Sequence, residues 1–237
     1  KVTVVFFQKT NSSVTDTISF LLKVIFILEN LNSELNVTLK KTEISAIILA
    51  SGIGKRMGRK NKGLLIFRGK PLIEHVIEKL HDQVSAVVIS CNEELEQYRR
   101  YHYPIATDIL NIDPSKTDNN EYSKEGNGPL AGLLSAGRKI TTPYCFITAC
   151  DMPFLPKTIV LDLASAIGDK DAISIKTRQG TEPLVSLVRT SSLQSIEHHL
   201  TSNRKSVKSW LATLSWTTLD SDSEQQFINL NHPEELH

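Results

Sequence analysis

Short runs of consecutive apolar residues recur along this chain from about residue 45 onward. Continuous runs of this length are typical of strands that are buried on both faces, as in a parallel sheet covered by helices. We therefore expect strands at residues 45–49, 84–90, 144–148, 172–175 and 183–188.

The stretches between these runs have the spacing of amphipathic helices. In residues 71–81 the apolar side chains recur with a helical period, and Pro71 suits a first helical turn. The stretches 129–139 and 157–167 show the same spacing. Alternating strands and helices predict an α/β fold, in which a mostly parallel sheet has helices on both faces. Ligands of such sheets bind beyond the carboxyl ends of the strands.

The first expected strand leads directly into a glycine-rich loop that contains basic residues. Residues 46–58 read AIILASGIGKRMG, and Lys62 follows closely. Glycines let backbone N–H groups approach an anion, and Arg56 and Lys62 add positive charge, so the segment indicates phosphate binding. A strand–turn–helix joint whose glycines only relieve strain is the alternative.

Spacing excludes two common nucleotide-binding loops. A P-loop requires Gly, four residues and then Gly-Lys-Ser/Thr, and no such string occurs in the chain. A dinucleotide-binding loop requires G-x-G-x-x-G, but the third position here is Met57 and the glycine follows at Gly58. A kinase and a simple NAD dehydrogenase are therefore not expected.

Composition narrows the class of protein further. The 237 residues suffice for one large α/β domain, and 27 Lys and Arg residues balance 26 Asp and Glu residues. A dedicated nucleic-acid-binding protein usually carries a basic excess, so we expect no nucleic-acid partner. Cys91, Cys145 and Cys150 form no CxxC pair, which favours packing roles in a reducing cytoplasm over disulfides or a zinc site.

Residues 1–42 differ from the rest of the chain. The apolar run at 18–28 is too short, and too interrupted by Lys23, for a membrane span, and it lacks a signal-cleavage pattern. The first methionine is Met57, inside the glycine-rich loop, so we do not expect the chain to begin at a native translation start. We predict an N-terminal extension outside the fold, followed by one domain at 43–237. A membrane-surface helix within the extension is the alternative.

Three further segments accompany the glycine-rich loop in a fixed order. They are NGPLAG at 127–132, CDMPFLP at 150–156 and FINLNHPEEL at 227–236. Together with the loop they resemble the signature of the MobA-like molybdenum cofactor guanylyltransferases: L-A-G-G-x-x-x-R-M-G with a following lysine, G-P-L-A-G, C-D-x-P-x-x-P and F-x-N-x-N-x-P-E-E-L. The resemblance covers about residues 43 to 237. It implies a three-layer, Rossmann-like nucleotidyltransferase fold with a mostly parallel central sheet.

The resemblance implies a guanylyl transfer. The terminal phosphate of molybdenum-bound molybdopterin would attack the α-phosphorus of GTP and release pyrophosphate, giving the guanine dinucleotide form of the molybdenum cofactor. Such a reaction requires charge neutralisation and alignment rather than covalent chemistry by the protein. The expected partners are GTP, molybdenum-molybdopterin, other proteins of molybdenum cofactor biosynthesis and molybdoenzyme chaperones.

Asp151 is the candidate ligand for Mg²⁺. It follows the strand expected at 144–148, and Mg²⁺ binds one or two carboxylates together with substrate phosphates. A helix N-cap before Pro153 is the alternative role. In a strand, Asn229 and Asn231 would share one face, where their oxygens would complete the metal site or hold its waters beside the substrate. A polar turn is the alternative there.

The resemblance also assigns nucleotide contacts. Arg56 and Lys62 would bind the triphosphate and stabilise the departing pyrophosphate. Asn92 and Asp108 match guanosine-contacting positions. A carboxylate at Asp108 can accept hydrogen bonds from the N1–H and 2-amino groups of guanine, and a ribose contact is equally open. Contacts through backbone groups are implied for Leu49, Ala50, Ser51 and Gly52.

Three more residues are expected to contact the substrate. Gly128 and Gly132 would flank a tight turn where the backbone approaches a ligand, and Lys205 would meet the pterin phosphate. The polar stretch 111–127 before them is expected to be a surface loop, which either closes over a ligand or is a simple variable insertion.

The chain departs from the family pattern at two positions. Ser51 replaces a glycine, which strains the backbone only if that residue needs a positive φ. Asn61 replaces the aspartate before the lysine; asparagine can partly substitute if this residue orients Lys62, whereas activity should fall if it acts on the metal. Three alternatives stay open: a CTP-dependent cytidylyltransferase of the same cofactor, a transferase for a sugar or polyol phosphate (which the C-terminal motif disfavours), and a non-catalytic nucleotide-binding relative.

Overall fold

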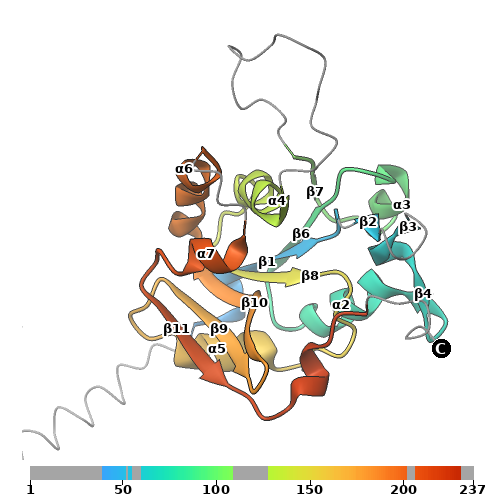
Figure 1. The fold of residues 1–237 in the computed structure, drawn as a ribbon. Helices are drawn as coiled ribbons and strands as arrows, with labels where there is room; N and C mark the ends of the chain where they lie inside the picture. The colour runs from blue at the N-terminus through green and yellow to red at the C-terminus, as the bar shows by residue number, and fades with distance from the viewer. Residues whose placement is uncertain (1–38, 52, 55–59, 109–127, 202–205, 231–237) are drawn as a thin grey trace, which may run out of the picture. The chain divides into compact units, whose positions relative to one another are not determined.

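A seven-stranded sheet forms the centre of the fold, in the order β11-β9-β10-β8-β1-β6-β7 (Figure 1). The computed structural model describes residues 39–51, 53–54, 60–108, 128–201 and 206–230. The strands of the sheet are β1 (Ile44–Leu49), β6 (Ala86–Ser90), β7 (Ile105–Ala106), β8 (Tyr144–Ala149), β9 (Ala172–Thr177), β10 (Gly180–Arg189) and β11 (Trp216–Asp220).

Every neighbouring pair of strands in this sheet is parallel except the two pairs that include β10. β1 pairs in parallel with β6 and β8, β6 with β7, and β9 with β11, whereas β10 is antiparallel to both β8 and β9. Leu49 at the end of β1 lies in register with Ser90 of β6 and Ala149 of β8. The carboxyl ends of these three strands therefore meet at one edge of the sheet.

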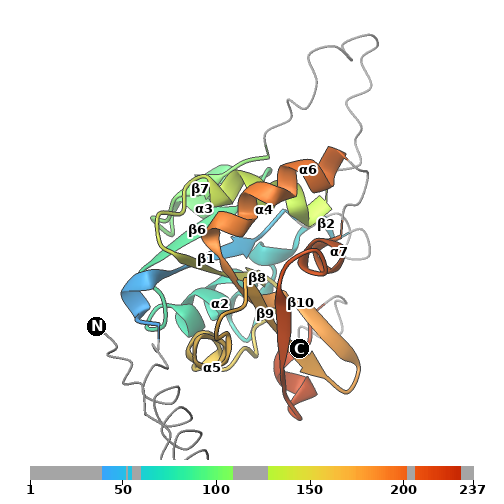
Figure 2. The ribbon, with the colours of Figure 1, turned by 90° about the vertical axis from the view of Figure 1, so that its left-hand side faces the viewer.

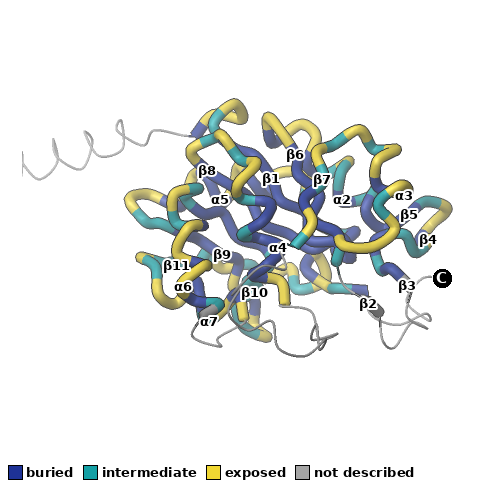
Figure 3. The backbone as a smooth tube through the Cα atoms, turned by 90° about the horizontal axis from the view of Figure 1, so that it is seen from above, coloured by how far each residue is buried: buried dark blue, intermediate teal, exposed yellow. Residues whose placement is uncertain are grey.

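Helices cover both faces of the sheet, as Figures 1 and 2 show. One face carries α2 (Leu72–Leu80) and α5 (Ile159–Ala166), and the other carries α4 (Gly128–Gly137), α6 (Ser195–Thr201) and α7 (Val207–Leu211). Alternate residues of β1 join the two cores: Ala46 and Ile48 belong to the first, and Ile47 and Leu49 to the second. β1 is therefore buried along its whole length, which explains why its sequence is apolar apart from Ser45. Figure 3 shows the buried strands in dark blue, surrounded by exposed connections.

Several short elements lie outside the seven-stranded sheet. The short helix α3 (Leu95–Arg99) follows β6. Two small hairpins are formed by β2 (Ile53–Gly54) with β3 (Lys60–Asn61) and by β4 (Ile66–Phe67) with β5 (Lys70–Pro71). The 3₁₀ helices in the described part are η1 (Lys41–Glu43), η3 (Lys62–Leu64), η5 (Thr190–Gln194) and η6 (Glu224–Phe227).

The predicted α/β fold with a mostly parallel sheet is confirmed. The five expected strands correspond to β1, β6, β8, β9 and β10, and the three expected helices to α2, α4 and α5. β6 begins at Ala86, two residues later than predicted, and β10 begins at Gly180, three residues earlier, because its first half pairs with β9.

The strand assumed for Asn229 and Asn231 is not observed over the described residues. Phe227 ends η6, and residues 228–230 have no regular secondary structure. The backbone N–H of Leu230 donates to the carbonyl oxygen of Asp151 at 3.0 Å instead of to a neighbouring strand. The C-terminal segment is therefore held against the segment that follows β8.

The predicted N-terminal extension lies largely outside the described residues, as does the polar stretch 111–127. Leu39 is buried in the core that β1 and α2 share, and Lys41 Nζ donates to the carbonyl oxygen of His81 at 2.9 Å. The boundary before residue 43 stays a prediction, and a truncation that tests it should retain Leu39. In the part of the chain that the structure covers, no helix is long and apolar enough to span a bilayer.

Candidate functional site

A cavity of about 400 Å³ opens at the carboxyl ends of β1, β6 and β8. Predicted site residues from distant parts of the sequence line it: Leu49, Ser51, Lys62, Asn92, Asp108, Gly128, Gly132, Asp151 and Asn229. Ala50 is fully buried and is the one predicted residue in the described part that does not line the cavity. Gly52, Arg56, Lys205 and Asn231 lie outside the described residues, so their roles stay predictions.

Backbone hydrogen bonds continue the sheet register into the loops around the cavity. The N–H of Ala50 donates to the carbonyl oxygen of Ser90 at 2.7 Å, and the N–H of Cys150 donates to that of Leu49 at 3.0 Å. The hydroxyl of Ser51 also donates to the Ser90 carbonyl, at 3.3 Å. These bonds fix the first residues after β1 and β8 relative to each other, so both segments leave the sheet side by side.

Ser51 adopts a backbone conformation that serine tolerates. In the described part, the non-glycine residues with positive φ are Arg68, Glu94 and His102. Since Ser51 is not among them, replacing the family's glycine with serine introduces no left-handed strain at this position.

Lys62 and Asp151 form an ion pair inside the cavity. Lys62 Nζ lies 3.0 Å from Asp151 Oδ2, and the two side chains are 20% and 8% exposed. Asp151 does not cap a helix, because α5 begins only at Ile159 and its N-cap residue is Thr158. The carboxylate instead faces the cavity, together with the lysine that follows the glycine-rich loop.

Asn61 does not line the cavity but fixes the turn that carries Lys62. Its Oδ1 accepts a hydrogen bond from the N–H of Gly63 at 3.2 Å and so caps η3. The same oxygen accepts a hydrogen bond from the hydroxyl of Tyr98. An aspartate at this position would offer the same acceptor oxygen, so the departure from the family pattern preserves both contacts.

Asp108 and Asn92 lie together at the ends of β7 and β6. The backbone N–H of Asp108 donates to Asn92 Oδ1 at 2.8 Å. Burial raises the pKa of the Asp108 carboxyl, and a hydrogen bond with the Asn92 side chain partly opposes that rise in pKa. Asp108 Oδ1 and Ser90 Oγ are buried and have no hydrogen-bond partner within the described residues. Asp108 lines the cavity, whereas Ser90 is fully buried and does not. Because a buried oxygen is costly to leave unpaired, Asp108 marks this side of the cavity as suited to a polar ligand.

Residues 128–132 of the NGPLAG segment form the start of a helix rather than the tight turn that we expected. Gly128 has a φ of 72° and opens α4, while Gly132 lies within that helix. A Cβ atom at Gly132 would lie 2.5 Å from Ser90 Oγ and 3.5 Å from Asp108 Oδ1. The absence of a side chain at Gly132 therefore lets α4 approach the end of β6 closely.

The oxygen groups at the cavity suit a hard cation. Asp151 supplies a carboxylate, and Asn229 supplies an amide oxygen. Over the described residues there is no group of three or more His, Cys, Asp or Glu side chains that could hold a metal on their own. Mg²⁺ commonly binds through one or two carboxylates plus phosphate oxygens and waters, so this sparse set fits Mg²⁺ better than zinc.

The three cysteines have the packing roles that their sequence context indicates. Cys91, Cys145 and Cys150 are free and buried. Burial raises the pKa of the Cys91 thiol to about 11, and it raises the pKa values of the Cys145 and Cys150 thiols as well. All three are therefore protonated near neutral pH, although Cys150 lines the cavity.

Sequence reasoning missed Ser90 and Tyr98. Ser90 is the last residue of β6, and its position at the carboxyl edge of a parallel sheet was an available signal. Tyr98 lies in a helix of five residues, too short to show a period, and its contact with Asn61 joins positions 37 residues apart. Nothing local in the sequence indicates that contact.

The chain matches known proteins over most of its length. A family model described as the MobA-like NTP transferase domain matches residues 46–219. The molybdenum cofactor guanylyltransferase of Cupriavidus metallidurans is 31% identical over 206 residues, which cover 84% of this chain and 95% of that protein. The molybdenum cofactor guanylyltransferase of Mannheimia succiniciproducens is 33% identical over 197 residues, covering 81% and 96%.

Solved structures show the same fold. Molybdopterin-guanine dinucleotide biosynthesis protein A from Archaeoglobus fulgidus has a TM-score of 0.62 and 24% sequence identity, over 81% of this chain and 94% of that one. The resemblance drawn from the four motifs is confirmed by the family model and by the curated relatives. The chain belongs to the MobA-like NTP transferase family of nucleotidyltransferases.

Proposed function

We propose that this protein transfers GMP from GTP to molybdenum-bound molybdopterin and releases pyrophosphate. The observation that carries the proposal is the contact between Lys62 and Asp151 in a cavity that also contains Asp108. The cavity then offers the Lys62 ammonium group to phosphate, the Asp151 carboxylate to a metal ion and the Asp108 carboxylate to the edge of a purine. The names of the relatives supply the identity of the nucleotide and of the acceptor.

Lys62 is the proposed triphosphate ligand in the described part of the site. An ammonium group has three donors, so Lys62 can contact phosphate oxygens while it stays near Asp151. Its positive charge would stabilise the negative charge that develops on pyrophosphate as it leaves. Arg56, in the glycine-rich loop, is proposed to act on the same phosphates.

Asp151 is the proposed ligand of Mg²⁺. Both Asp151 and Asn229 line the cavity, and the residue after Asn229, Leu230, donates its backbone N–H to the Asp151 carbonyl oxygen. Asn229 and Asn231 are proposed to complete the metal site or to hold its waters. When bound, Mg²⁺ would neutralise charge on the triphosphate and on the incoming phosphate.

Asp108 is the proposed selector of guanine. Its Oδ1 is buried without a partner in the part of the chain described, and its backbone is held by Asn92. A carboxylate accepts hydrogen bonds from the N1–H and 2-amino groups of guanine, whereas adenine carries no N1–H. A ribose contact by the same carboxylate remains the alternative.

The remaining residues are proposed to hold the two substrates from the sides of the cavity. The nucleotide would contact backbone groups of residues 49–52, which begin at the last residue of the buried strand β1. Gly128 and Gly132, which line the cavity, would let the backbone approach a bound substrate, and Lys205 would meet the pterin phosphate. We further propose a cytoplasmic setting with other proteins of cofactor biosynthesis and with molybdoenzyme chaperones, which the three free thiols support.

The direct test is nucleotide-dependent transfer. Purified protein is mixed with Mg²⁺, molybdenum-loaded molybdopterin and one of GTP, CTP or ATP, and the dinucleotide product is identified by mass spectrometry. We expect product with GTP alone. Product with CTP alone would keep the reaction but reverse the nucleotide assignment. Binding of GTP without any product would favour a non-catalytic nucleotide-binding relative.

A further inference from the structure

We propose that Tyr98 and Asn61 are positioning residues, which hold Lys62 where it meets the nucleotide phosphates. This inference rests on the proposed function, because it concerns the lysine to which that function gives the triphosphate contact. Neither Tyr98 nor Asn61 lines the cavity, so neither is expected to touch substrate. Both act, in this proposal, through the short turn η3 that carries Lys62.

The side-chain oxygen of Asn61 joins two separate elements. It accepts hydrogen bonds from the backbone N–H of Gly63, at 3.2 Å, and from the hydroxyl of Tyr98. Gly63 belongs to η3, whereas Tyr98 belongs to α3, which follows β6 in the sequence. One buried oxygen therefore ties the start of η3 to a helix in another part of the fold.

Lys62 lies in the sequence between Asn61, which carries this oxygen, and Gly63, which donates a hydrogen bond to it. Its predecessor Asn61 pairs with Ile53 in the small β2–β3 sheet, and its successor Gly63 donates to the Asn61 side chain. The carbonyl oxygen of Lys62 accepts a hydrogen bond from the N–H of Leu65 at 3.1 Å, which closes the turn. Since the backbone is held on both sides of Lys62, a displacement of Asn61 must displace Lys62 as well.

The packing around Gly63 connects this turn with Asp151. A Cβ atom at Gly63 would lie 2.5 Å from the Tyr98 hydroxyl and 3.2 Å from Cys150 Sγ. Cys150 immediately precedes Asp151, the carboxylate that Lys62 contacts at 3.0 Å. The Tyr98 hydroxyl, the Gly63 backbone and the Cys150 side chain are thus close-packed beneath the ion pair, and a shift in one would be transmitted to the others.

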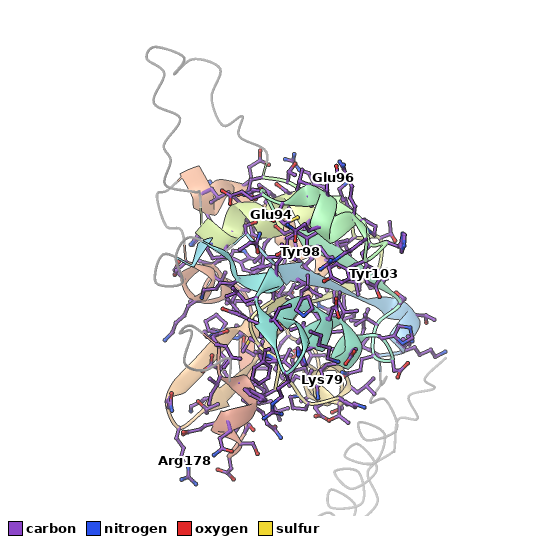
Figure 4. All side chains as sticks on the ribbon, turned by 90° about the vertical axis from the view of Figure 1, so that its right-hand side faces the viewer. Lys79, Glu94, Glu96, Tyr98, Tyr103 and Arg178 are labelled. Atoms are coloured by element: carbon purple, nitrogen blue, oxygen red, sulfur yellow. The ribbon has the colours of Figure 1, made fainter. Side chains whose placement is uncertain are left out.

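Tyr98 is itself firmly anchored. It is fully buried, whereas most residues of its short helix are exposed. Figure 4 shows Tyr98 inside the molecule, with Glu94 and Glu96 of the same segment at the surface. Burial raises the pKa of the Tyr98 hydroxyl above its usual range, so the hydroxyl remains a hydrogen-bond donor at any working pH.

The first experiment removes only the donor. Tyr98→Phe should lower kcat/KM for GTP by about tenfold, because Lys62 loses a defined position. If Tyr98 acts through Lys62, the same substitution in a Lys62→Ala background should change kcat/KM by less than about twofold. Tyr101→Phe is the matched control, because the Tyr101 hydroxyl donates to Glu74 at 3.0 Å away from the cavity.

The acceptor is tested by a graded pair of substitutions. Asn61→Leu removes the oxygen that serves Gly63 and Tyr98, and it should reduce kcat/KM at least as much as Tyr98→Phe. Asn61→Asp keeps an acceptor oxygen and should lose far less activity than Asn61→Leu. Equal losses for the two variants would contradict a role for the acceptor oxygen in positioning Lys62.

A measurement on the nucleotide-free protein separates this inference from the proposed function. The rate at which an amine-acylating reagent labels Lys62 is followed by peptide mass spectrometry, with the exposed Lys157 as the internal reference. We expect Tyr98→Phe, but not Tyr101→Phe, to change the Lys62 rate about threefold or more relative to Lys157. This result would support the positioning role even if the wild-type protein transferred no nucleotide. Two results together would overturn the positioning role: Tyr98→Phe leaves the acylation rate of Lys62 unchanged, and its loss of kcat/KM persists in the Lys62→Ala background.

Discussion

Lys62 Nζ lies 3.0 Å from Asp151 Oδ2, although 89 residues separate the two positions in the chain. They meet because β1 and β8 are adjacent parallel strands, so the segments that follow them leave the sheet at the same edge. The Lys62 side chain is 20% exposed and that of Asp151 is 8% exposed. The pair is therefore open to an anionic ligand on one side, and the lysine keeps a carboxylate partner when no ligand is bound.

Asp151→Asn should reduce kcat for transfer by about 100-fold or more, because the substitution removes the proposed carboxylate ligand of Mg²⁺ while preserving side-chain volume. The rate of dinucleotide formation should be measured across a Mg²⁺ titration. We expect the dependence on Mg²⁺ to weaken or to move to much higher concentration. GTP binding in the absence of Mg²⁺ should change far less than the rate.

Asp162→Asn is the matched control for that substitution. Asp162 lies on α5 and accepts a hydrogen bond from the Thr158 hydroxyl at 2.9 Å in an exposed setting. The control should transfer GMP at close to the wild-type rate. If Asp151→Asn retained both the wild-type rate and the wild-type Mg²⁺ dependence, the assignment of Asp151 to the metal would be wrong.

Gly63→Ala should impair transfer and lower stability together. The new Cβ would lie 2.5 Å from the Tyr98 hydroxyl, and forced overpacking of a buried site costs about 1–3 kcal/mol. Thermal unfolding and GTP transfer should both be measured. Gly69→Asn is the control for the steric contact: its φ of 85° makes any side chain there cost some stability, but the space around its Cβ position is open, so transfer should stay close to the wild-type rate. A fully active and stable Gly63→Ala variant would contradict the close packing described here.

The sequence predicts the sheet and the location of the cavity for one physical reason. β1 and β8 are buried on both faces, so their sequences are apolar apart from Ser45 and Thr148, and the polar and glycine-rich segments begin where each strand ends. In a parallel sheet those ends share one edge, and the residues singled out after each strand therefore come together. The position of each segment after a buried strand, together with the family resemblance, was enough to predict that Lys62 and Asp151 lie around the same site, and both line the cavity.

The supporting contacts could not be predicted in the same way. The contact of Tyr98 with Asn61 depends on the exact path of a five-residue helix, which has no periodic signal. The alternation of Asn229 and Asn231 suggested a strand, but Leu230 forms its backbone hydrogen bond with Asp151 instead. We expected Gly132 in a turn, where its lack of a side chain would let a ligand approach. In the structure, the lack of a side chain instead lets α4 pack against Ser90.

Selection of GTP over ATP should depend on pH through Asp108. Burial raises the pKa of this carboxyl, so on acidification it takes up its proton at a higher pH than an ordinary aspartate does. The proposed contact with guanine needs the ionised form, and the preference for GTP should therefore decline as the pH falls through this raised pKa. Asp108→Asn should reduce the GTP preference by about tenfold and abolish its pH dependence. Competition binding of GTP and ATP across a pH series provides the measurement.

The raised pKa of Asp108 also predicts how stability depends on pH. Stability should fall as the pH rises, whereas the preference for GTP should fall as the pH falls. Because the folded-state pKa is raised, the native protein binds this proton more readily than the unfolded chain does. The charged carboxylate therefore lowers the free energy of unfolding as the pH rises through the folded-state pKa, and Asp108→Asn should raise the Tm at neutral pH. A lower Tm for Asp108→Asn at neutral pH would mean that the carboxylate has a stabilising partner.

Gly132→Ala should destabilise the protein through Ser90. The added Cβ would lie 2.5 Å from Ser90 Oγ, and overpacking at this buried contact should cost about 1–3 kcal/mol, or several degrees of Tm. Ser90→Ala alone should leave the Tm unchanged or raise it, because the Ser90 hydroxyl is buried without a partner among the described residues. The double variant should then recover most of the stability that Gly132→Ala loses.

Measurements of nucleotide binding distinguish the steric role of Ser90 from a role in contacting a ligand. Ser90 is fully buried and does not line the cavity, so Ser90→Ala should leave GTP binding close to that of the wild type, and the double variant should bind GTP as well as Gly132→Ala does while regaining its Tm. Isothermal titration with GTP and thermal unfolding of the four proteins in this cycle provide the test. A double variant as unstable as Gly132→Ala would show that Leu49, whose side chain lies 3.2 Å from the same Cβ position, sets the limit instead of Ser90.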